Sequence, residues 1–586
     1  MRIGEIESIT RLSAGTIRYW EERGLVSFGR SENSYRDIPD ETIVLLEKIK
    51  LFRRLGIAIA DIKLWRDNIL SERELISARR LKLEEDSRSN LDQRKLCEEL
   101  LGGFSDPSDI RDIFFTEIPE HPGKLSLGVD IGTTSVSAKL VSLETGEALH
   151  TYTLEHHAAL SSDDPSVSKE ASAPDAFAAN AEKLLELSLG LVRSAVDSFP
   201  EIVAVGFTGQ MHGIVCLDEA GNILSPLWTW QNQFGQRRLG DETVCEKIAR
   251  LTSRNVPTGY GLSTYYALRE SGALPEGTKS ITTIADLAVM KLCRLKNPVS
   301  HPTNAASLGL FDINKQCFDK AALDALRIDP AILPQIAGDF EAVGEYRGIK
   351  VSAAIGDNQA GVFGSLSCDG DLLLNIGTSG QVSFASNSPA LLTDDPCCEV
   401  RPYFAGQFLH SGSTLCGGRA YSMLADLVSE ILDSFGAGQP REKIYSFLNE
   451  SAKRADGRLS VSTRFSGTRK DPSVTGLISN ITTFDLNAAE LAYGFLYGMV
   501  DELSMLCREL TGSEENKKMR LIVSGNAMRK NPALRKIAGG IFGCDPLIPV
   551  QTEEAAFGAA LYAAISAGAI EIDKAKKLIF YGGNEK

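Results

Sequence analysis

The spacing of apolar residues divides the chain into a short helical start and a longer body in which strands and helices alternate. Residues 3–10 and 13–22 fit two short helices, and residues 40–54 fit a third that Gly56 separates from a fourth. Between the two pairs, the stretch SFGRSENSYRDI predicts a short hairpin. The predicted order is helix-turn-helix, wing and helix pair, which is the arrangement of a small DNA-reading module.

The pattern changes at residue 125. LSLGVDIGTTSVSAKLVSL alternates apolar residues with small or polar ones, which predicts a strand, a tight Gly-Thr-Thr turn and a second strand. Further strands are predicted at 201–207, 213–217 and 521–524, and helices near 174–198 and 486–510. Because strands and helices alternate along this part of the chain, we expect an α/β protein.

Two segments connect these parts. Residues 71–101 are predicted to form a helical segment roughly 45 Å long, at about 1.5 Å per residue. Its apolar spacing is patchy and the polar stretch EEDSRSN interrupts any heptad seam, so a homodimer through this segment is left open. Residues 102–123 carry Gly and Pro at both ends and are predicted to be a linker.

Composition narrows the classes of protein that fit. The 586 residues are enough for three or four domains, and 43% hydrophobic with 24% charged residues is ordinary for a globular protein. No run of eighteen apolar residues and no signal-peptide core occur, so we expect a cytoplasmic protein without a membrane partner. The eleven cysteines lack a CxxC pair or a Cys/His metal spacing, which argues against a structural zinc site.

Charge is distributed unevenly between the first module and the body. Residues 1–101 contain 19 Lys and Arg against 19 Asp and Glu, so the whole net charge of −15 lies on the remainder. A neutral module is repelled less by nucleic acid than an acidic body. It still lacks the strongly basic composition of a typical DNA-binding domain.

The first module resembles the MerR family of transcription regulators over residues 2–68, through the stretches IGEI, LSAGTIRYWEERGL, ENSYRDI and LFRRLGIAIADIK. The resemblance implies that Arg18 and Tyr19 contact double-stranded DNA from the recognition helix. It implies that Tyr35 and Arg36 reach the DNA backbone from the wing, where a guanidinium group can pair with phosphate. The alternative is a retained helical module that serves only for packing or for binding a partner.

One short motif occurs twice in the body. DIGTTS stands at 130–135 and NIGTSG at 375–380, each directly after an apolar strand. Glycine lets such a turn bring backbone amides close to an anion, and the hydroxyl groups add donors. Two such loops predict a duplicated fold that holds the phosphates of a nucleotide between its halves. No GxxxxGK[ST] motif is present, so a P-loop is not the alternative.

Three further elements carry candidate chemistry. Asp357, in AAIGDNQAG, stands at the start of a predicted helix, where a carboxylate acts either as a helix cap or as a base. Beside two phosphate loops we favour the base, because phosphoryl transfer needs a group that accepts the proton of the attacking hydroxyl. His212, in GFTGQMHGIVCLD, has no second histidine at ligand spacing, so it fits a hydrogen bond to a polyol better than a metal. VSGNAMRKNPALRK predicts either a pocket for a flat base or an ordinary strand-loop-helix crossover.

These elements, in this order, resemble the FGGY family of carbohydrate kinases across residues 125–566. The resemblance implies two actin-like ATPase (ribonuclease H-like) domains with an active site in the cleft between them, here preceded by the all-α winged helix-turn-helix domain. It implies ATP and Mg²⁺ as cofactors, Asp357 as the catalytic base, and Asp130 near Mg²⁺ through water. The implied nucleotide contacts are Asp130, Gly132, Thr133, Thr134, Gly377, Thr378, Ser379, Gly418, Gly525 and Asn526. The implied sugar contacts are Gln210, Met211, His212, Trp230, Asn232, Asp357 and Asn358.

The resemblance also bears on the sugar. GQMHGIV, TWQNQ, VPTGYGLST and NAASLGLFD are most similar to the sedoheptulokinase branch of the family, whereas GQMHG alone is shared with xylulokinases. The implied reaction is phosphorylation of the terminal primary hydroxyl of a ketose, sedoheptulose to sedoheptulose 7-phosphate. The chain departs from the family's Trp-x-Asp-x-Arg arrangement, because Asn232 and Phe234 follow Trp230 in place of the acid and the cation. A xylulokinase-like pentulose kinase and a catalytically weak, sugar-sensing transcription regulator therefore stay as alternatives.

The expected domain organisation has five parts. They are a DNA-binding domain at 1–70, a helical segment at 71–101, a linker at 102–123, an N-terminal kinase domain at 124–368 and a C-terminal kinase domain at 369–586.

Overall fold

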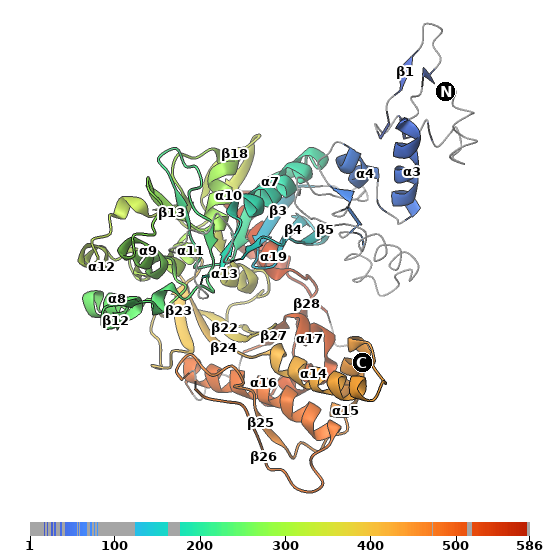
Figure 1. Cartoon of the computed structure of the whole chain (residues 1–586), viewed down its shortest axis with the longest axis vertical. Coiled ribbons are helices and arrows are strands. Elements are labelled where there is room, and N and C mark those ends of the chain that lie inside the picture. The colour runs from blue at the N-terminus through green and yellow to red at the C-terminus, as the bar shows by residue number, and fades with distance from the viewer. Residues whose placement is uncertain are drawn as a thin grey trace.

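The computed structural model describes residues 123–161, 176–471, 473–512 and 519–582, together with parts of the segment 17–79. Figure 1 shows two α/β lobes stacked along the long axis, with the described parts of the first module beside the upper lobe. Most of the predicted helical segment at 71–101, and all but the last residue of the predicted linker, lie outside the described residues.

The first module contains a short hairpin and a helix pair at the predicted places. The hairpin pairs β1 (Gly29–Arg30) with β2 (Arg36–Asp37) in antiparallel fashion, and the helices are α3 (Glu41–Arg54) and α4 (Ile59–Arg66). Phe52 and Trp65 pack edge to face across the helix pair, with ring centroids 4.9 Å apart. The two helices that should precede the hairpin lie mostly outside the described residues, so the helix-turn-helix itself stays a prediction.

The upper lobe is built on a seven-stranded mixed sheet with the order β18-β19-β8-β3-β4-β5, in which β20 also pairs with β8. Its strands are β3 (Leu125–Ile131), β4 (Ser135–Ser142), β5 (Ala148–Glu155), β8 (Ile202–Gly209), β18 (Ala342–Tyr346), β19 (Ile349–Ser352) and β20 (Ile355–Gly356). β3 is buried along almost its whole length and pairs in parallel with β8, which explains its nearly continuous apolar run. Helices α7 (Ala181–Ser198) and α10 (Ile284–Cys293) pack against this sheet.

A set of short elements extends this lobe on the side away from the first module (Figure 1). Its helices are α8 (Val244–Thr252), α9 (Gly261–Glu270), α11 (Pro302–Ala305) and α12 (Lys320–Ala325), with 3-10 turns at Phe234–Gln236, Ala306–Leu308 and Pro330–Ile332. Its strands are β6 (Ala159–Leu160), β7 (Ala178–Ala179), β9 (Val215–Leu217), β10 (Leu227–Trp228), β11 (Arg238–Leu239), β12 (Glu242–Thr243), β13 (Ser280–Thr282), β14 (Val299–Ser300), β15 (Phe311–Asp312), β16 (Cys317–Phe318) and β17 (Gln335–Ile336). These elements enclose a separate apolar cluster around Trp228 and Phe234.

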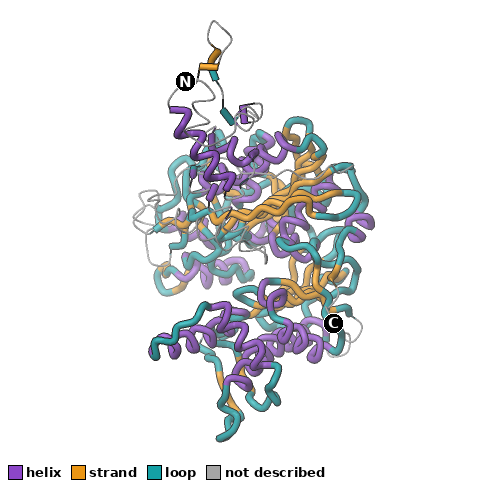
Figure 2. The backbone as a smooth tube through the Cα atoms, turned by 90° about the vertical axis from the view of Figure 1, so that its right-hand side faces the viewer, coloured by secondary structure: helices purple, strands orange, loops and turns teal. Residues whose placement is uncertain are grey.

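The lower lobe repeats the same plan with fewer strands. Its five-stranded sheet has the order β23-β24-β22-β21-β27, made of β21 (Leu372–Ile376), β22 (Gly380–Ser386), β23 (Cys398–Pro402), β24 (Phe408–Thr414) and β27 (Leu521–Ser524). Its helices are α14 (Gly418–Ser434), α15 (Arg441–Ala452), α16 (Ala488–Thr511), α17 (Asn526–Lys530) and α18 (Pro532–Phe542). The hairpin β25 (Ser460–Ser462) and β26 (Leu477–Ser479) lies beyond α16. Figure 2 shows the two sheets as separate groups of strands, one in each lobe.

The two lobes are joined by more than one crossing of the chain. After α13 (Asp357–Phe363) the chain enters the lower lobe, and it returns after β28 (Ile548–Pro549) as α19 (Glu554–Ser566). α19 lies directly on the upper sheet, because a Cβ at Gly128 of β3 would be only 1.9 Å from the Ala556 carbonyl oxygen. The predicted boundary at 368/369 therefore separates the two sheets, but α19, which follows it, packs with the first domain. The chain ends in α20 (Ile572–Lys577) and β29 (Tyr581–Gly582).

Candidate active site

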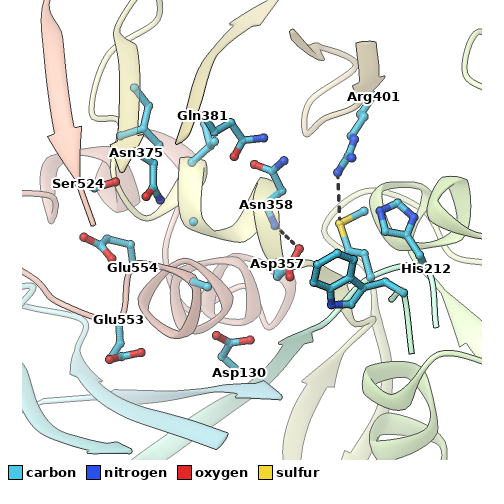
Figure 3. Close-up of a pocket in the computed structure, with 16 residues that line it drawn as sticks. Asp130, His212, Asp357, Asn358, Asn375, Gln381, Arg401, Ser524, Glu553 and Glu554 are labelled. Atoms are coloured by element: carbon cyan, nitrogen blue, oxygen red, sulfur yellow. Dashed lines mark hydrogen bonds between the residues drawn. The ribbon is translucent and has the colours of Figure 1, made fainter. Parts of the chain in front are cut away.

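A cleft of about 440 Å³ lies between the two sheets. Both lobes line it, and Figure 3 shows carboxylate and amide side chains pointing into it from opposite sides. The lining residues are Asp130, Met211, His212, Trp230, Asp357, Asn358, Gly361, Val362, Leu373, Asn375, Gln381, Arg401, Ser524, Glu553, Glu554 and Ala555. Six of the predicted site residues are therefore in one cavity, although they come from four separate stretches of sequence.

Asp130 is the last polar position of β3, at the start of the first phosphate loop. Burial, together with the nearby negative charges of Asp357 and Glu553, raises the pKa of its carboxyl to about 8. Its Oδ1 atom is buried and has no hydrogen-bond partner among the described residues. A buried carboxylate oxygen without a donor is costly, so the site is suited to a cation or a proton.

The first loop is held in shape by its own backbone and by two side chains. The Gly132 amide donates to the Ser135 carbonyl over 2.9 Å, and the Gln210 amide group donates to the Gly132 carbonyl over 3.2 Å. The His156 ring lies 3.3 Å from the same carbonyl. Thr134, at the tip, is exposed. The Gly132 carbonyl is therefore engaged from two sides, and Asp130 is the residue of this loop that lines the cleft, so the phosphate contacts of Gly132, Thr133 and Thr134 stay predictions.

The second loop sits on the start of α14. The Gly418 amide donates to the Gly377 carbonyl and the Gly417 amide donates to the Thr378 carbonyl, over 2.9 and 3.0 Å. A Cβ at Gly418 would lie 2.6 Å from the Gly377 oxygen, so only glycine permits this approach. Thr378 and Ser379 stay exposed at the tip. The structure thus brings together Gly377, Thr378, Ser379 and Gly418 at the start of α14, next to the cleft-lining Asn375 and Gln381, and their contact with the nucleotide stays a prediction.

The predicted adenosine side lies next to this loop. Gly525 has φ of +87° and caps α17, and a Cβ there would lie 2.5 Å from the Ile376 carbonyl oxygen. β27 pairs in parallel with β21, which places Ser524 opposite Asn375 at the edge of the cleft. Gly525 and Asn526 therefore follow directly from the end of β27, beside the second loop, and their contact with the adenosine stays a prediction.

Asp357 begins α13 in the middle of the cleft wall. The amide of Asn358 donates to its Oδ1 over 2.6 Å, and burial raises the pKa of the carboxyl to about 6, against the lowering effect of that bond and of Arg401. The strand before it is anchored by Thr208, whose hydroxyl donates to the Ile355 carbonyl over 2.8 Å. Gly356 is the residue at the N-cap, so Asp357 itself is not the cap of this helix. A carboxylate with a pKa near 6 is ionised at neutral pH and can accept a proton.

His212 lies at the far end of the cleft in a left-handed backbone conformation, with φ of +73°. Its Nδ1 is 2.9 Å from the Ser307 carbonyl, which assigns the proton to Nδ1 and leaves Nε2 as an acceptor. Burial, together with the positive charge of Arg401, lowers the pKa of the ring to about 3, so the ring is neutral at pH 7. Its neighbour Met211 is buried and also lines the cleft.

Trp230 lines the cleft and is hydrogen-bonded to the first loop. Its indole Nε1 donates to the Thr133 hydroxyl over 3.1 Å, and the side chain is 47% exposed. A large aromatic ring at a cavity mouth, held by one hydrogen bond, is suited to stacking against a flat or apolar face of a ligand.

Three positions highlighted by sequence lie behind the cleft wall. Asn232 is fully buried, and its amide group donates to the Thr229 carbonyl over 2.6 Å and to the Thr264 hydroxyl over 3.2 Å. Phe234 is also fully buried, and Gln210 lies behind the first loop. Asn232 therefore shapes the turn that presents Trp230, and its predicted contact with the sugar stays a prediction.

Several lining residues were not predicted. Asn375 and Gln381 flank the second loop, and Glu553 and Glu554 start α19. Asn375 could have been predicted from the sequence, because it occupies the place of Asp130 in the repeated motif. Glu553 and Arg401 could not, because no short motif marks a carboxylate before a helix or an arginine inside a strand.

The described residues show no arrangement that binds a metal by protein groups alone. No group of three or more His, Cys, Asp or Glu among them is placed to hold a metal ion. A single carboxylate beside phosphate loops fits a Mg²⁺ ion that takes its other ligands from phosphate and water. In the part of the chain that the structure describes, no helix is long and apolar enough to cross a membrane.

The predicted DNA contacts cannot be placed as side chains. Arg18, Tyr19 and Tyr35 lie outside the described residues, and only the backbone of Arg36 is described, within β2.

Comparisons with known proteins agree with this architecture. Residues 125–364 match the N-terminal domain, and residues 372–567 the C-terminal domain, of the FGGY family of carbohydrate kinases. Residues 1–68 match the MerR HTH family regulatory protein. Human sedoheptulokinase is 27% identical over 470 residues, which cover 75% of this chain and 96% of that protein. The xylulose kinase of Staphylococcus xylosus is 25% identical over 471 residues, covering 75% and 90%.

Solved structures show the same fold. The xylulose kinase from Rhodospirillum rubrum has a TM-score of 0.66 at 19% identity, covering 78% of this chain and 93% of that one. The glycerol kinase of Plasmodium falciparum with ADP has a TM-score of 0.63 at 17% identity over the same shares. The expected pair of actin-like domains around a cleft is thereby confirmed.

Proposed function

Since the chain belongs to the FGGY family of carbohydrate kinases, we propose that it phosphorylates the terminal primary hydroxyl of a ketose, most simply sedoheptulose, with Mg-ATP. The observation that carries the proposal is the position of Asp357, a half-buried carboxylate at a helix start that lines the cleft between the two lobes. The names of the human and mouse sedoheptulokinases support the choice of sugar, and the xylulose kinases among the relatives keep a pentulose as the second candidate.

The proposed reaction is an in-line transfer. Asp357 accepts the proton of the sugar hydroxyl as its oxygen attacks the γ-phosphorus, and the bond from that phosphorus to the β–γ bridging oxygen breaks to release ADP. The two loops, one from each lobe, hold the phosphates through backbone amides and hydroxyl groups. Asp130 would hold Mg²⁺ through water, and the ion would supply charge neutralisation for the phosphates.

The far end of the cleft orients the sugar. Neutral His212 offers Nε2 as an acceptor for a sugar hydroxyl, and its left-handed backbone is kept by the Ser307 hydroxyl, which accepts from the His212 amide over 3.1 Å. Trp230 covers the mouth beside the first loop. Closure of the two lobes over the sugar would exclude water and limit hydrolysis of ATP.

The test is ADP release by the full chain with Mg-ATP across sedoheptulose, xylulose, ribulose, gluconate and glycerol. We expect strong turnover on sedoheptulose. Strong turnover on xylulose or ribulose alone would replace the proposed sugar by a pentulose. The absence of turnover on all five, with measurable nucleotide binding, would instead favour a sugar-sensing regulator.

We also propose that the first module binds double-stranded DNA, because residues 1–68 match a regulatory helix-turn-helix family. In this proposal Arg18, Tyr19, Tyr35 and Arg36 make the contacts, and the kinase domains supply a sugar-dependent signal to them. Replacing Arg18 and Arg36 together by Ala should weaken binding at least tenfold in a mobility-shift assay at fixed salt, because charge-assisted contacts to phosphate are lost. Equal affinity of the variant and the parent chain would leave the module as a tether.

A further inference from the structure

Arg401 occupies a position that the reaction above does not use. It lies on β23 of the lower lobe, its side chain is only 13% exposed, and its guanidinium group lines the cleft. Its Nη2 donates to Glu399 over 2.7 Å on the same strand. A buried cation at the wall of a substrate cleft is costly unless something uses its donors.

The other terminal nitrogen of this guanidinium, Nη1, reaches across the cleft. Nη1 points at the Met211 sulfur of the upper lobe over 3.6 Å, as the dashed line in Figure 3 shows. A thioether is a weak acceptor, much weaker than a hydroxyl or carbonyl oxygen. Besides Glu399, the guanidinium interacts with the hydroxyl of Tyr260, so the thioether is its weakest partner, in a place where an oxygen of a ligand would be a better one.

The neighbours of Arg401 define what kind of ligand fits. The His212 ring lies tilted against Tyr260, with ring centroids 4.1 Å apart, and the charge of Arg401 acts on both His212 and Asp357. Arg401 thus lies within electrostatic range of the base at one end and of the sugar-facing histidine at the other. In Figure 3 it approaches His212 from the side opposite to Asp130.

The balance of charge favours a neutral ligand. Arg469 lies 3.9 Å from Glu399, so two guanidinium groups, of Arg401 and Arg469, face two carboxylates, of Glu399 and Asp357. No net positive charge is left to recruit a carboxylate or a phosphate at this end. Hydroxyl and carbonyl oxygens, by contrast, accept from a guanidinium without needing a counter-charge.

Pro402, the residue after Arg401, connects β23 to the helix that begins with Asp357. The Gln359 side chain, two positions after Asp357, donates to the Pro402 carbonyl over 3.2 Å. β23 therefore touches the upper lobe at two points, through Pro402 to the helix of the base and through Arg401 to Met211. A ligand that moves Arg401 acts on the contact between the lobes.

We propose that Arg401 is a specificity-determining residue of the kinase, which exchanges the Met211 sulfur for a hydroxyl or carbonyl oxygen of the ketose remote from the phosphorylated hydroxyl. Only a sugar long enough to reach from Asp357 to Arg401 then bridges the two lobes. This inference rests on the proposed function and adds the residue that selects sugars by the length of their carbon chain.

The test uses the full chain with Arg401→Lys and Arg401→Gln, and measures sugar binding by calorimetry and turnover by ADP release. We expect the Kd and KM for sedoheptulose to rise roughly 10- to 100-fold, the effect of losing one charge-assisted hydrogen bond. Lysine should not rescue, because it cannot hold Glu399 and the sugar at once with a planar fork. The KM for ATP should stay within about twofold, and the ratio of kcat/KM between sedoheptulose and glycerol should fall.

The matched control is Arg469→Gln, which removes a guanidinium near the same Glu399 but does not line the cleft. We expect it to change the sugar ratio by less than about twofold. The proposal is wrong if Arg401→Gln and Arg469→Gln lower kcat/KM by the same factor for every sugar acceptor. It is also wrong if Arg401→Lys has the same kcat/KM for sedoheptulose as the parent chain. A parent chain that binds sedoheptulose without turnover would overturn the proposed function alone, since the binding measurement still decides the role of Arg401.

Discussion

The two phosphate loops have the same backbone setting and different chemistry. In each, a buried strand pairs in parallel with one neighbour and turns through a Gly-Thr pair into an antiparallel partner. Asp130 is the last residue but one of the first strand and Asn375 of the second, so a carboxylate in one half is an amide in the other. Both side chains line the same cleft, from opposite lobes.

This difference teaches where charge is placed in a duplicated fold. Both loops can donate to phosphate through amides, but two carboxylates facing the same phosphates would repel them. The amide at 375 keeps the shape of the acid without its charge. The upper lobe also supplies Asp357, so it carries the carboxylates for both the proton and the proposed cation, and the lower lobe contributes polar but uncharged groups at its loop.

Removing the proposed base should have the largest effect, because the proton of the attacking hydroxyl then loses its acceptor. Asp357→Asn keeps the shape of the side chain, and we expect kcat to fall by roughly 10³-fold, within the range for a lost general base. Nucleotide binding, measured by calorimetry, should be unchanged. A variant with more than about a tenth of the parent rate would show that another group accepts the proton.

Exchanging the acid and the amide tests the comparison directly. Asp130→Asn should lower kcat/KM by roughly 10²-fold and raise the Mg²⁺ concentration needed for half-maximal rate, because the carboxylate that would hold the ion is gone.

The reciprocal change, Asn375→Asp, should raise the KM for ATP through repulsion of the phosphates, and the double exchange should not restore activity. Recovery of activity in the double variant would show that the two loops are equivalent, and that the side of the cleft bearing the charge is irrelevant.

A smaller effect is expected when the second loop is pushed away from α14. Gly418→Ala places a Cβ 2.6 Å from the Gly377 carbonyl oxygen, so the loop must shift, and we expect the KM for ATP to rise about tenfold with the KM for sugar unchanged. Gly540→Ala on α18 is the matched control, because a Cβ there meets nothing within 4 Å. An equal response of both variants would remove the loop from the nucleotide site.

The acid limb of the pH profile should report Asp357. Its pKa of about 6 means that the carboxylate fraction falls as the pH drops through 6, so kcat/KM should fall about tenfold between pH 7 and pH 5. A flat profile over this range would contradict the role of a base with this pKa.

The same shift predicts a modest effect on stability. Because burial raises the pKa of Asp357, the folded chain binds this proton more tightly than the unfolded chain does. Ionised Asp357 therefore lowers the free energy of unfolding. This loss grows as the pH rises from about 4 to about 6 and is complete above pH 6. Asp357→Asn should therefore raise Tm by a few degrees at pH 8 and by much less at pH 4, measured by calorimetry with unliganded protein. An equal shift at both pH values would reject the burial of charge as its cause.

The sequence by itself determined the elements whose cause is local. The strand-turn-strand around each phosphate loop depends on alternating side chains and on glycine in a tight turn, and Asp357 was recognisable because it follows a short apolar strand at a helix start. The repeated motif, 245 positions apart, predicted a duplicated α/β fold, and the structure shows both copies facing one cleft. The winged first module was predicted in the same way, from short stretches with local periodicity.

Only the tertiary structure decided which side chains converge. Asn232 and Arg401 both carry polar groups within strands and turns, and no local pattern shows that Asn232 is enclosed behind Trp230 while Arg401 crosses the cleft. Glu553 reaches the site because α19 returns to the upper sheet, a packing that depends on Gly128 and Gly558 meeting the backbone of residues far away in the chain. Convergence of this kind is set by how distant elements pack, and packing is a property of pairs of segments that no single segment contains.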